Sequence, residues 1–103
     1  MGGLSNSEVN ASIRGYILRS LVKGYNFSLS AKTLANKMQA NGLISGTSNI
    51  SRQLYYLYGY NLIQFSGKSD AFSALEDDAV IRLTVEGIRF IESGGNSEMG
   101  IDL

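Results

Sequence analysis

Cysteine and histidine are absent from this chain of 103 residues, and its apolar runs are short. Without these two residue types, a disulfide framework, a thiol nucleophile, a histidine general base and the usual zinc and copper sites are excluded. No apolar segment approaches the ~20 residues needed to span a bilayer. The N-terminus also lacks a basic segment followed by an apolar one, so we expect a cytoplasmic protein with no membrane contact.

Enzymatic chemistry would have to rest on carboxylates. The densest group of acids, Glu76-Asp77-Asp78, lies in an expected loop with no pocket implied around it. A magnesium site is conceivable there, but a solvated acidic loop is the favoured interpretation. No glycine-rich phosphate loop is present, because Gly42 and Gly46 lack the lysine and the spacing of that motif. We therefore expect no catalytic activity, no cofactor and no bound metal.

A length of 103 residues with 44% hydrophobic residues suffices for one core and leaves no room for a second domain. We expect a single domain over residues 1–103, with an ordered part from about 7 to 92. The remaining residues, 93–103, are small and polar and predict a flexible tail.

The charges are unevenly distributed although the net charge is zero. Residues 1–68 contain seven basic side chains and one acid, whereas residues 69–103 contain eight acids and two basic side chains. If the fold keeps these parts on separate faces, the surface should be strongly polarised. A positive part of this kind favours a DNA-binding protein.

Residues 47–63 predict a helix that ends in a turn and a strand. Ile50, Leu54 and Leu57 recur at helical spacing and form a stripe that should face the core. The other side carries side chains with donors of the kind that contact base edges and phosphates. These residues are Ser48, Asn49, Arg52, Tyr55 and Tyr56. A core helix with a tyrosine-rich surface is the alternative interpretation.

Two segments resemble winged helix-turn-helix regulators of the broad ArsR/MarR type. Residues 49–63 (NISRQLYYLYGYNLI) are similar to their recognition helix and following strand, with the Ser-Arg-x-Leu-x-x-Leu core. Residues 83–91 (LTVEGIRFI) are similar to their Leu-Thr-x-x-Gly-x-x-x-Leu ending, in which Val85, Ile88 and Ile91 should face the core. The resemblance implies an α+β winged helix-turn-helix fold with a three-helix core, a small antiparallel wing hairpin and a C-terminal helix. The turn before the recognition helix departs from the pattern, because it is longer here.

The resemblance also implies that the recognition helix enters the major groove of double-stranded DNA. Arg52 could then bind guanine with two parallel hydrogen bonds, and Lys68 would be the cation of the wing. Lys32 and the amide groups at the start of its helix could contact phosphates, although a solvated lysine is an equally good interpretation of Lys32. The full set of expected DNA-binding residues is Lys32, Ser48, Asn49, Ser51, Arg52, Tyr55, Tyr56 and Lys68.

The remaining elements are predicted from capping residues and apolar spacing. Helices are expected from near Ser5 to Lys23 and from Ala31 to about Ala40, and short strands at 27–29, 60–65 and 80–83. The first helix has a second apolar stripe, so that it is apolar on two sides and either lies within the core or contacts a partner chain. The residues of this second stripe are Ala11, Gly15, Leu18 and Val22.

The functions that these patterns predict fall into two classes. One is a DNA-binding protein, either a transcription regulator or a centromere-binding adaptor of a plasmid partition system. The other is a winged helix that contacts a protein partner through its tyrosines. The basic part around Arg52 favours DNA, and the second stripe together with the need to read two half-sites favours a homodimer.

Overall fold

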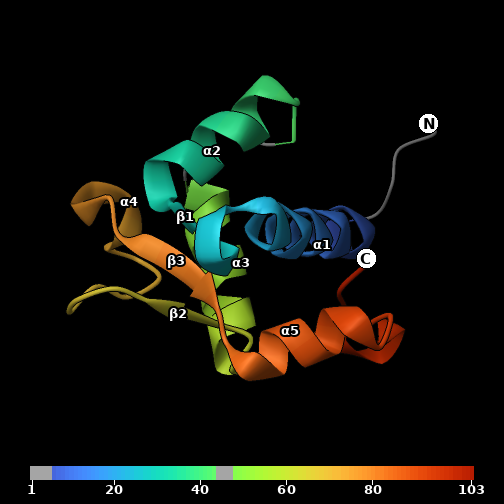
Figure 1. Ribbon diagram of the computed structural model, residues 1–103. Helices are drawn as coiled ribbons and strands as arrows, with labels where there is room; N and C mark the ends of the chain where they lie inside the picture. The colour runs from blue at the N-terminus through green and yellow to red at the C-terminus, as the bar shows by residue number, and fades with distance from the viewer. Residues whose placement is uncertain (1–5, 44–47) are drawn as a thin grey trace.

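Helix α1 (Asn6–Lys23) lies at the centre of the molecule and packs against two other helices and two strands of the sheet (Figure 1). The computed structural model describes residues 6–43 and 48–103, without the side chains of residues 6, 7, 48, 49 and 97. The spacing of Val9, Ile13, Ile17 and Leu21 predicts one apolar stripe on α1, and the last three of these residues are buried, whereas Val9 is 37% exposed.

The described residues form a compact α+β fold of five α-helices and one three-stranded antiparallel sheet. The Cα radius of gyration is 12.7 Å, close to the value of about 13 Å for a compact domain of this length. Within this part of the chain, no helix is both long and apolar enough to cross a membrane. After α1 the elements are η1 (Tyr25–Phe27), β1 (Ser28–Ser30), α2 (Ala31–Ala40), α3 (Ser48–Gly59), β2 (Ile63–Phe65), α4 (Ala74–Asp77), β3 (Val80–Leu83), α5 (Val85–Glu92) and η2 (Ser97–Met99).

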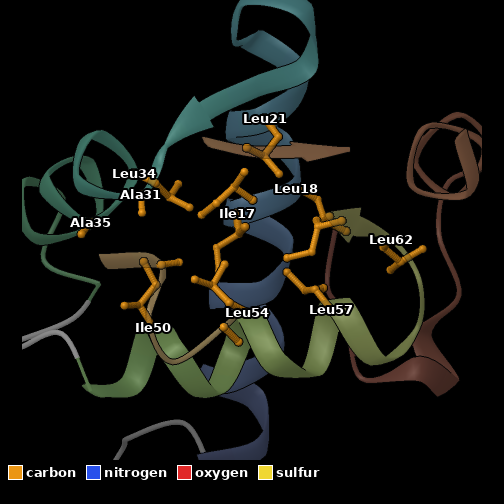
Figure 2. Packing of buried hydrophobic residues seen from close by; sticks show 14 of the residues in the cluster. Ile17, Leu18, Leu21, Ala31, Leu34, Ala35, Ile50, Leu54, Leu57 and Leu62 are labelled. Carbon is orange, nitrogen blue, oxygen red and sulfur yellow. The ribbon is translucent and has the colours of Figure 1, made fainter. Parts of the chain in front are cut away.

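Helices α2 and α3 form as their sequences predict. The Ser30 side chain accepts a hydrogen bond from the Thr33 amide and caps α2, which buries Leu34 and Met38 among other residues. The predicted stripe of α3, made of Ile50, Leu54 and Leu57, is fully buried. Figure 2 shows these side chains pointing toward α1, where Ile17 and Leu18 meet them.

The sheet has the strand order β1-β3-β2, with β3 paired antiparallel to both neighbours. Ile81 of β3 lies opposite Leu29 on one side and Phe65 on the other, and it is fully buried. Arg82, the next residue, is exposed on the opposite face, as the period of two along a strand requires. The connection from β2 to β3 was expected to be a loop, and it contains the short helix α4.

Helix α5 begins as predicted, because the Thr84 side chain accepts a hydrogen bond from the Gly87 amide. Ile88 and Ile91 are half-buried against the core. The expectation that Val85 faces the core is wrong, since its side chain is exposed in the first turn of the helix. Gly87 packs so closely against the Leu62 carbonyl that no side chain fits there.

The second stripe of α1 belongs largely to the core of this chain. Gly15 and Leu18 are buried, and of the remaining two residues only Val22 is exposed. The sequence left core and partner chain open as explanations, and the structure selects the core for Gly15 and Leu18. A homodimer would therefore have to use another surface.

The C-terminal segment is not a free tail, so the expectation for residues 93–103 is wrong at its end. Ile101 is buried in the core, and the Asp102 amide donates a hydrogen bond to the Ala11 carbonyl of α1. The backbone of Asp102 lies directly over Gly15, where any side chain would overlap it. The end of the chain returns to α1 (Figure 1), and there Ile101 is part of the core and Leu103 packs against it.

Candidate nucleic-acid interface

The exposed side of α3 carries Arg52, Tyr55 and Tyr58, which follow one another at intervals of three residues. Residues three apart lie on the same side of a helix, so these side chains form one row. Ser51 beside the row is half-buried, and the side chains of Ser48 and Asn49 lie outside the described residues. The sequence-based set of site residues omitted Tyr58, although its spacing from Tyr55 could have revealed it.

Arg52 is the only charged residue of α3. Its side chain is exposed and makes no hydrogen bond or ion pair with any described residue. A guanidinium held on a helix in this way keeps all its donors available to a ligand.

Tyr56 does not belong to the exposed row, and its expected role at the DNA is wrong. Its hydroxyl donates a hydrogen bond to the Met99 carbonyl in the C-terminal segment. The Arg14 guanidinium lies over its ring, 3.5 Å from the centroid. Burial, followed by a hydrogen bond with Tyr60, raises the pKa of Tyr56, and the positive charge of Arg14 opposes this shift. The Tyr56 hydroxyl proton is therefore bound within the chain and not directed at a phosphate.

The Arg14 guanidinium also forms hydrogen bonds within the chain. Its Nε donates to the Gln53 side chain at 2.6 Å, and a terminal nitrogen donates to the Gly100 carbonyl at 3.0 Å. Gln53 is buried and donates in turn to the Asn10 side chain at 3.1 Å. This network joins α1, α3 and the C-terminal segment, so one of the seven cations of residues 1–68 is not available to a phosphate.

The fold does not keep the basic and acidic parts of the sequence apart at the C-terminal segment. Arg19 donates a hydrogen bond to the Asp102 carbonyl at 3.3 Å, and Arg14 contacts the same segment. A strongly polarised surface was expected only if the fold keeps the two parts on separate faces, and this condition is not met at these two arginines, which bind backbone carbonyls of the acidic part. The basic side chains of residues 1–68 that the structure leaves exposed without a described partner are Lys23, Lys32, Arg52 and Lys68.

The amide groups at the start of α2 are already bound within the chain. The Lys32 amide donates to the Asp78 carboxylate at 3.0 Å, and the Ala31 amide donates to the Ala79 carbonyl at 2.8 Å. The Thr33 amide donates to the capping side chain of Ser30. The expected phosphate site on these amides is therefore wrong, because a carboxylate already occupies the helix start. The Lys32 side chain itself remains exposed.

The connection between β2 and β3, residues 66–79, is held together by its own polar groups. The Ser66 side chain accepts a hydrogen bond from the Val80 amide, and Ser69 donates to the Asp77 carboxylate at 2.7 Å. The Asp70 carboxylate accepts from two backbone amides, those of residues 72 and 73, which lowers its pKa. Lys68 is exposed near the start of this connection and is its only cation.

Aromatic rings join α3 to the sheet and to the 66–79 connection. Tyr55 contacts Phe72, with 5.5 Å between ring centroids, and Tyr58 contacts Phe65 at 5.6 Å. Tyr56 and Tyr60 lie 5.3 Å apart. The four tyrosines and Gly59 line an open hollow of about 470 Å³ at the C-terminal end of α3. The sequence did not predict this cluster of aromatic rings, because Phe65 and Phe72 come from other elements than α3.

Comparison with protein-family models, curated protein sequences and solved structures found no match to this chain. The likeness to winged-helix regulators therefore rests on the two sequence segments quoted above. The positions of the described side chains are the remaining guide to function.

Proposed function

We propose that the chain is a winged helix-turn-helix protein that binds double-stranded DNA and acts as a transcription regulator. Helix α3 is the recognition helix, the 66–79 connection between β2 and β3 is the wing, and α5 is the C-terminal helix. The observation that carries this proposal is the exposed Arg52 side chain on α3, which makes no hydrogen bond or ion pair with another residue that the structure describes. A guanidinium in this position can bind guanine O6 and N7 in the major groove.

Two other exposed cations belong to segments on either side of α3 in the sequence. They are Lys32 of α2 and Lys68 of the 66–79 connection, and in the proposed fold both could reach the phosphates of DNA bound by α3. Tyr55 beside Arg52 offers a hydroxyl that can donate to a phosphate. An adaptor of a plasmid partition system would use the same helix on repeated sites. A homodimer remains part of the proposal, with its contact surface outside the buried stripe of α1.

DNA affinity should fall steeply as the salt concentration rises, because binding would release the counterions of the phosphates that the exposed cations contact. With about three to four phosphates neutralised, log K against log salt should have a slope of about −3 to −4. Fluorescence anisotropy with a random-sequence duplex pool measures this slope. Absence of binding at low salt would contradict the proposed function.

Arg52→Ala and Lys68→Ala should weaken DNA binding in different ways. Loss of the Arg52 guanidinium should cost about 1 to 3 kcal/mol on the preferred site and much less on unrelated DNA. Loss of Lys68 should weaken all sequences nearly alike and reduce the salt slope by about one unit. The measurement is titration of both variants against a duplex selected from a random pool and against a scrambled duplex. Two equal and sequence-independent losses would show that α3 does not read bases.

A further inference from the structure

The turn that ends α2 contains the one asparagine in the sequence that is followed by glycine, Asn41 before Gly42. Such a pair can react within the chain. The glycine nitrogen gives up its proton to the solvent and attacks the asparagine Cγ, and the side-chain nitrogen takes up a proton and leaves as ammonia. Water then opens the five-membered imide to aspartate or isoaspartate. Glycine favours the ring closure because it has no side chain to hinder the approach.

Both reacting groups make hydrogen bonds in the folded chain. The Asn41 Nδ2 donates to the Tyr16 hydroxyl of α1 at 2.9 Å and to the Lys37 carbonyl at 2.8 Å. The Gly42 amide, whose nitrogen is the nucleophile, donates to the Gln39 carbonyl at 3.0 Å. The proton that must leave is therefore bound to an acceptor, and the Cγ that must be attacked belongs to a side chain fixed against α1.

The backbone of Asn41 also has the wrong conformation for ring closure. The imide ring requires the Gly42 nitrogen to lie on the side of the Asn41 Cβ. A ψ of 6° places that nitrogen next to the backbone nitrogen of Asn41 instead. Rotation to the reactive ψ would break the bond of the Gly42 amide and that of the Leu43 amide to the Met38 carbonyl, 2.9 Å long. These bonds are those of a helix end with a left-handed glycine, here with a φ of 71°.

We propose that Asn41 is a site of spontaneous deamidation, which the folded chain prevents through these hydrogen bonds and which proceeds only when the last turn of α2 opens. Helix ends open at a low free-energy cost, and both residues of the pair are exposed to water. The reaction requires no partner and no DNA.

Neither product restores the native turn. Aspartate places a carboxylate beside the Lys37 carbonyl at the C-terminal end of α2, where a negative charge is unfavourable. Isoaspartate lengthens the backbone by a methylene group, so the amides of Gly42 and Leu43 lose their register with the helix carbonyls. Deamidation should therefore loosen the end of α2 from α1.

The test compares the folded full chain with the same chain in urea, incubated in one mildly alkaline buffer. Peptide mapping by mass spectrometry measures the loss of Asn41 and separates aspartate from isoaspartate. We expect the folded chain to react at least about tenfold more slowly, which corresponds to an opening free energy of about 1.4 kcal/mol or more. Asn41→Gln is the control for the assignment, because its longer side chain closes a ring much more slowly and should leave this peptide unchanged.

Tyr16→Phe tests the contact with α1 directly. The variant removes one acceptor of the Asn41 amide, and the folded chain should react about two- to tenfold faster than the parent. In urea the two chains should react at the same rate, because the contact exists only in the fold. Tyr25→Phe is the matched control, since Tyr25 is 86% exposed and its hydroxyl makes no hydrogen bond with a described residue. It should react like the parent.

Three results would overturn the proposal. They are equal rates in the folded and unfolded chain, a folded Tyr16→Phe chain that reacts like the parent, and deamidation of other asparagines while Asn41 stays intact in urea. Circular dichroism shows whether the variants fold. If Tyr16→Phe does not fold, the comparison of the folded and unfolded parent decides the outcome.

Discussion

Leu18→Glu should unfold the protein. The Leu18 side chain is fully buried, and the variant removes about 2 to 3 kcal/mol of apolar burial. A carboxylate at the same place would lie in the apolar core without a partner, which costs several kcal/mol more. The sum is comparable with the whole stability of a small domain, about 5 to 15 kcal/mol. Urea denaturation followed by circular dichroism measures the loss.

Val22→Glu is the matched control for Leu18→Glu. Val22 lies one helical turn further along the same stripe and is 39% exposed, so its carboxylate can reach water. This variant should remain folded, with a change of about 1 kcal/mol or less. A folded, monomeric Leu18→Glu protein would instead show that the stripe is a contact between chains, as the sequence alone allowed.

Gly87→Ala should also lower the free energy of unfolding, by about 2 to 3 kcal/mol. In a helix, alanine is normally the better residue by up to about 1 kcal/mol. At Gly87 a Cβ would overlap the Leu62 carbonyl oxygen and lie 3.1 Å from a methyl group of Leu83. That carbonyl also accepts the Thr84 amide at the start of α5, so the helix cannot move away without weakening this contact.

Gly59→Ala serves as the control for Gly87→Ala, because a Cβ at this position at the end of α3 would meet nothing within 4 Å apart from its chain neighbours and the backbone of its own helix. This substitution should be neutral or stabilise the protein by about 0.5 kcal/mol. Thermal melts of the two variants give the comparison directly. An equally stable Gly87→Ala protein would mean that α5 does not pack tightly against the start of β2.

The features that the sequence predicted well are local ones. The buried stripe of Ile50, Leu54 and Leu57 follows from helical spacing within one segment, and the caps by Ser30 and Thr84 follow from residues three positions apart. Each depends on a hydrogen bond or a period that a short stretch of chain contains by itself.

The features that the sequence missed depend on contacts between distant segments. Tyr56 has the spacing of an exposed residue, but Arg14 and the Met99 carbonyl enclose it. Asp78 has the sequence surroundings of a solvated loop acid, but it binds the amide of Lys32 at the start of α2. No pattern within α3 or within the loop reveals a partner that comes from another part of the chain. For this reason the sequence assigned Tyr56 and the α2 amides to phosphate contacts, whereas the structure shows them bound to groups of the same chain.

The packing of the C-terminal segment on α1 has a consequence for synthesis on the ribosome. Arg14 and Gly100, which bind each other, are 86 residues apart in the chain. At about 5 to 20 residues per second, Arg14 is synthesised roughly 4 to 17 s before Gly100. During that interval the C-terminal segment cannot yet pack on Ala11 and Gly15 of α1. The Arg14 side chain also lacks the Gly100 carbonyl as its hydrogen-bond acceptor. The native contacts of the first helix can therefore be completed only after translation has passed residue 102.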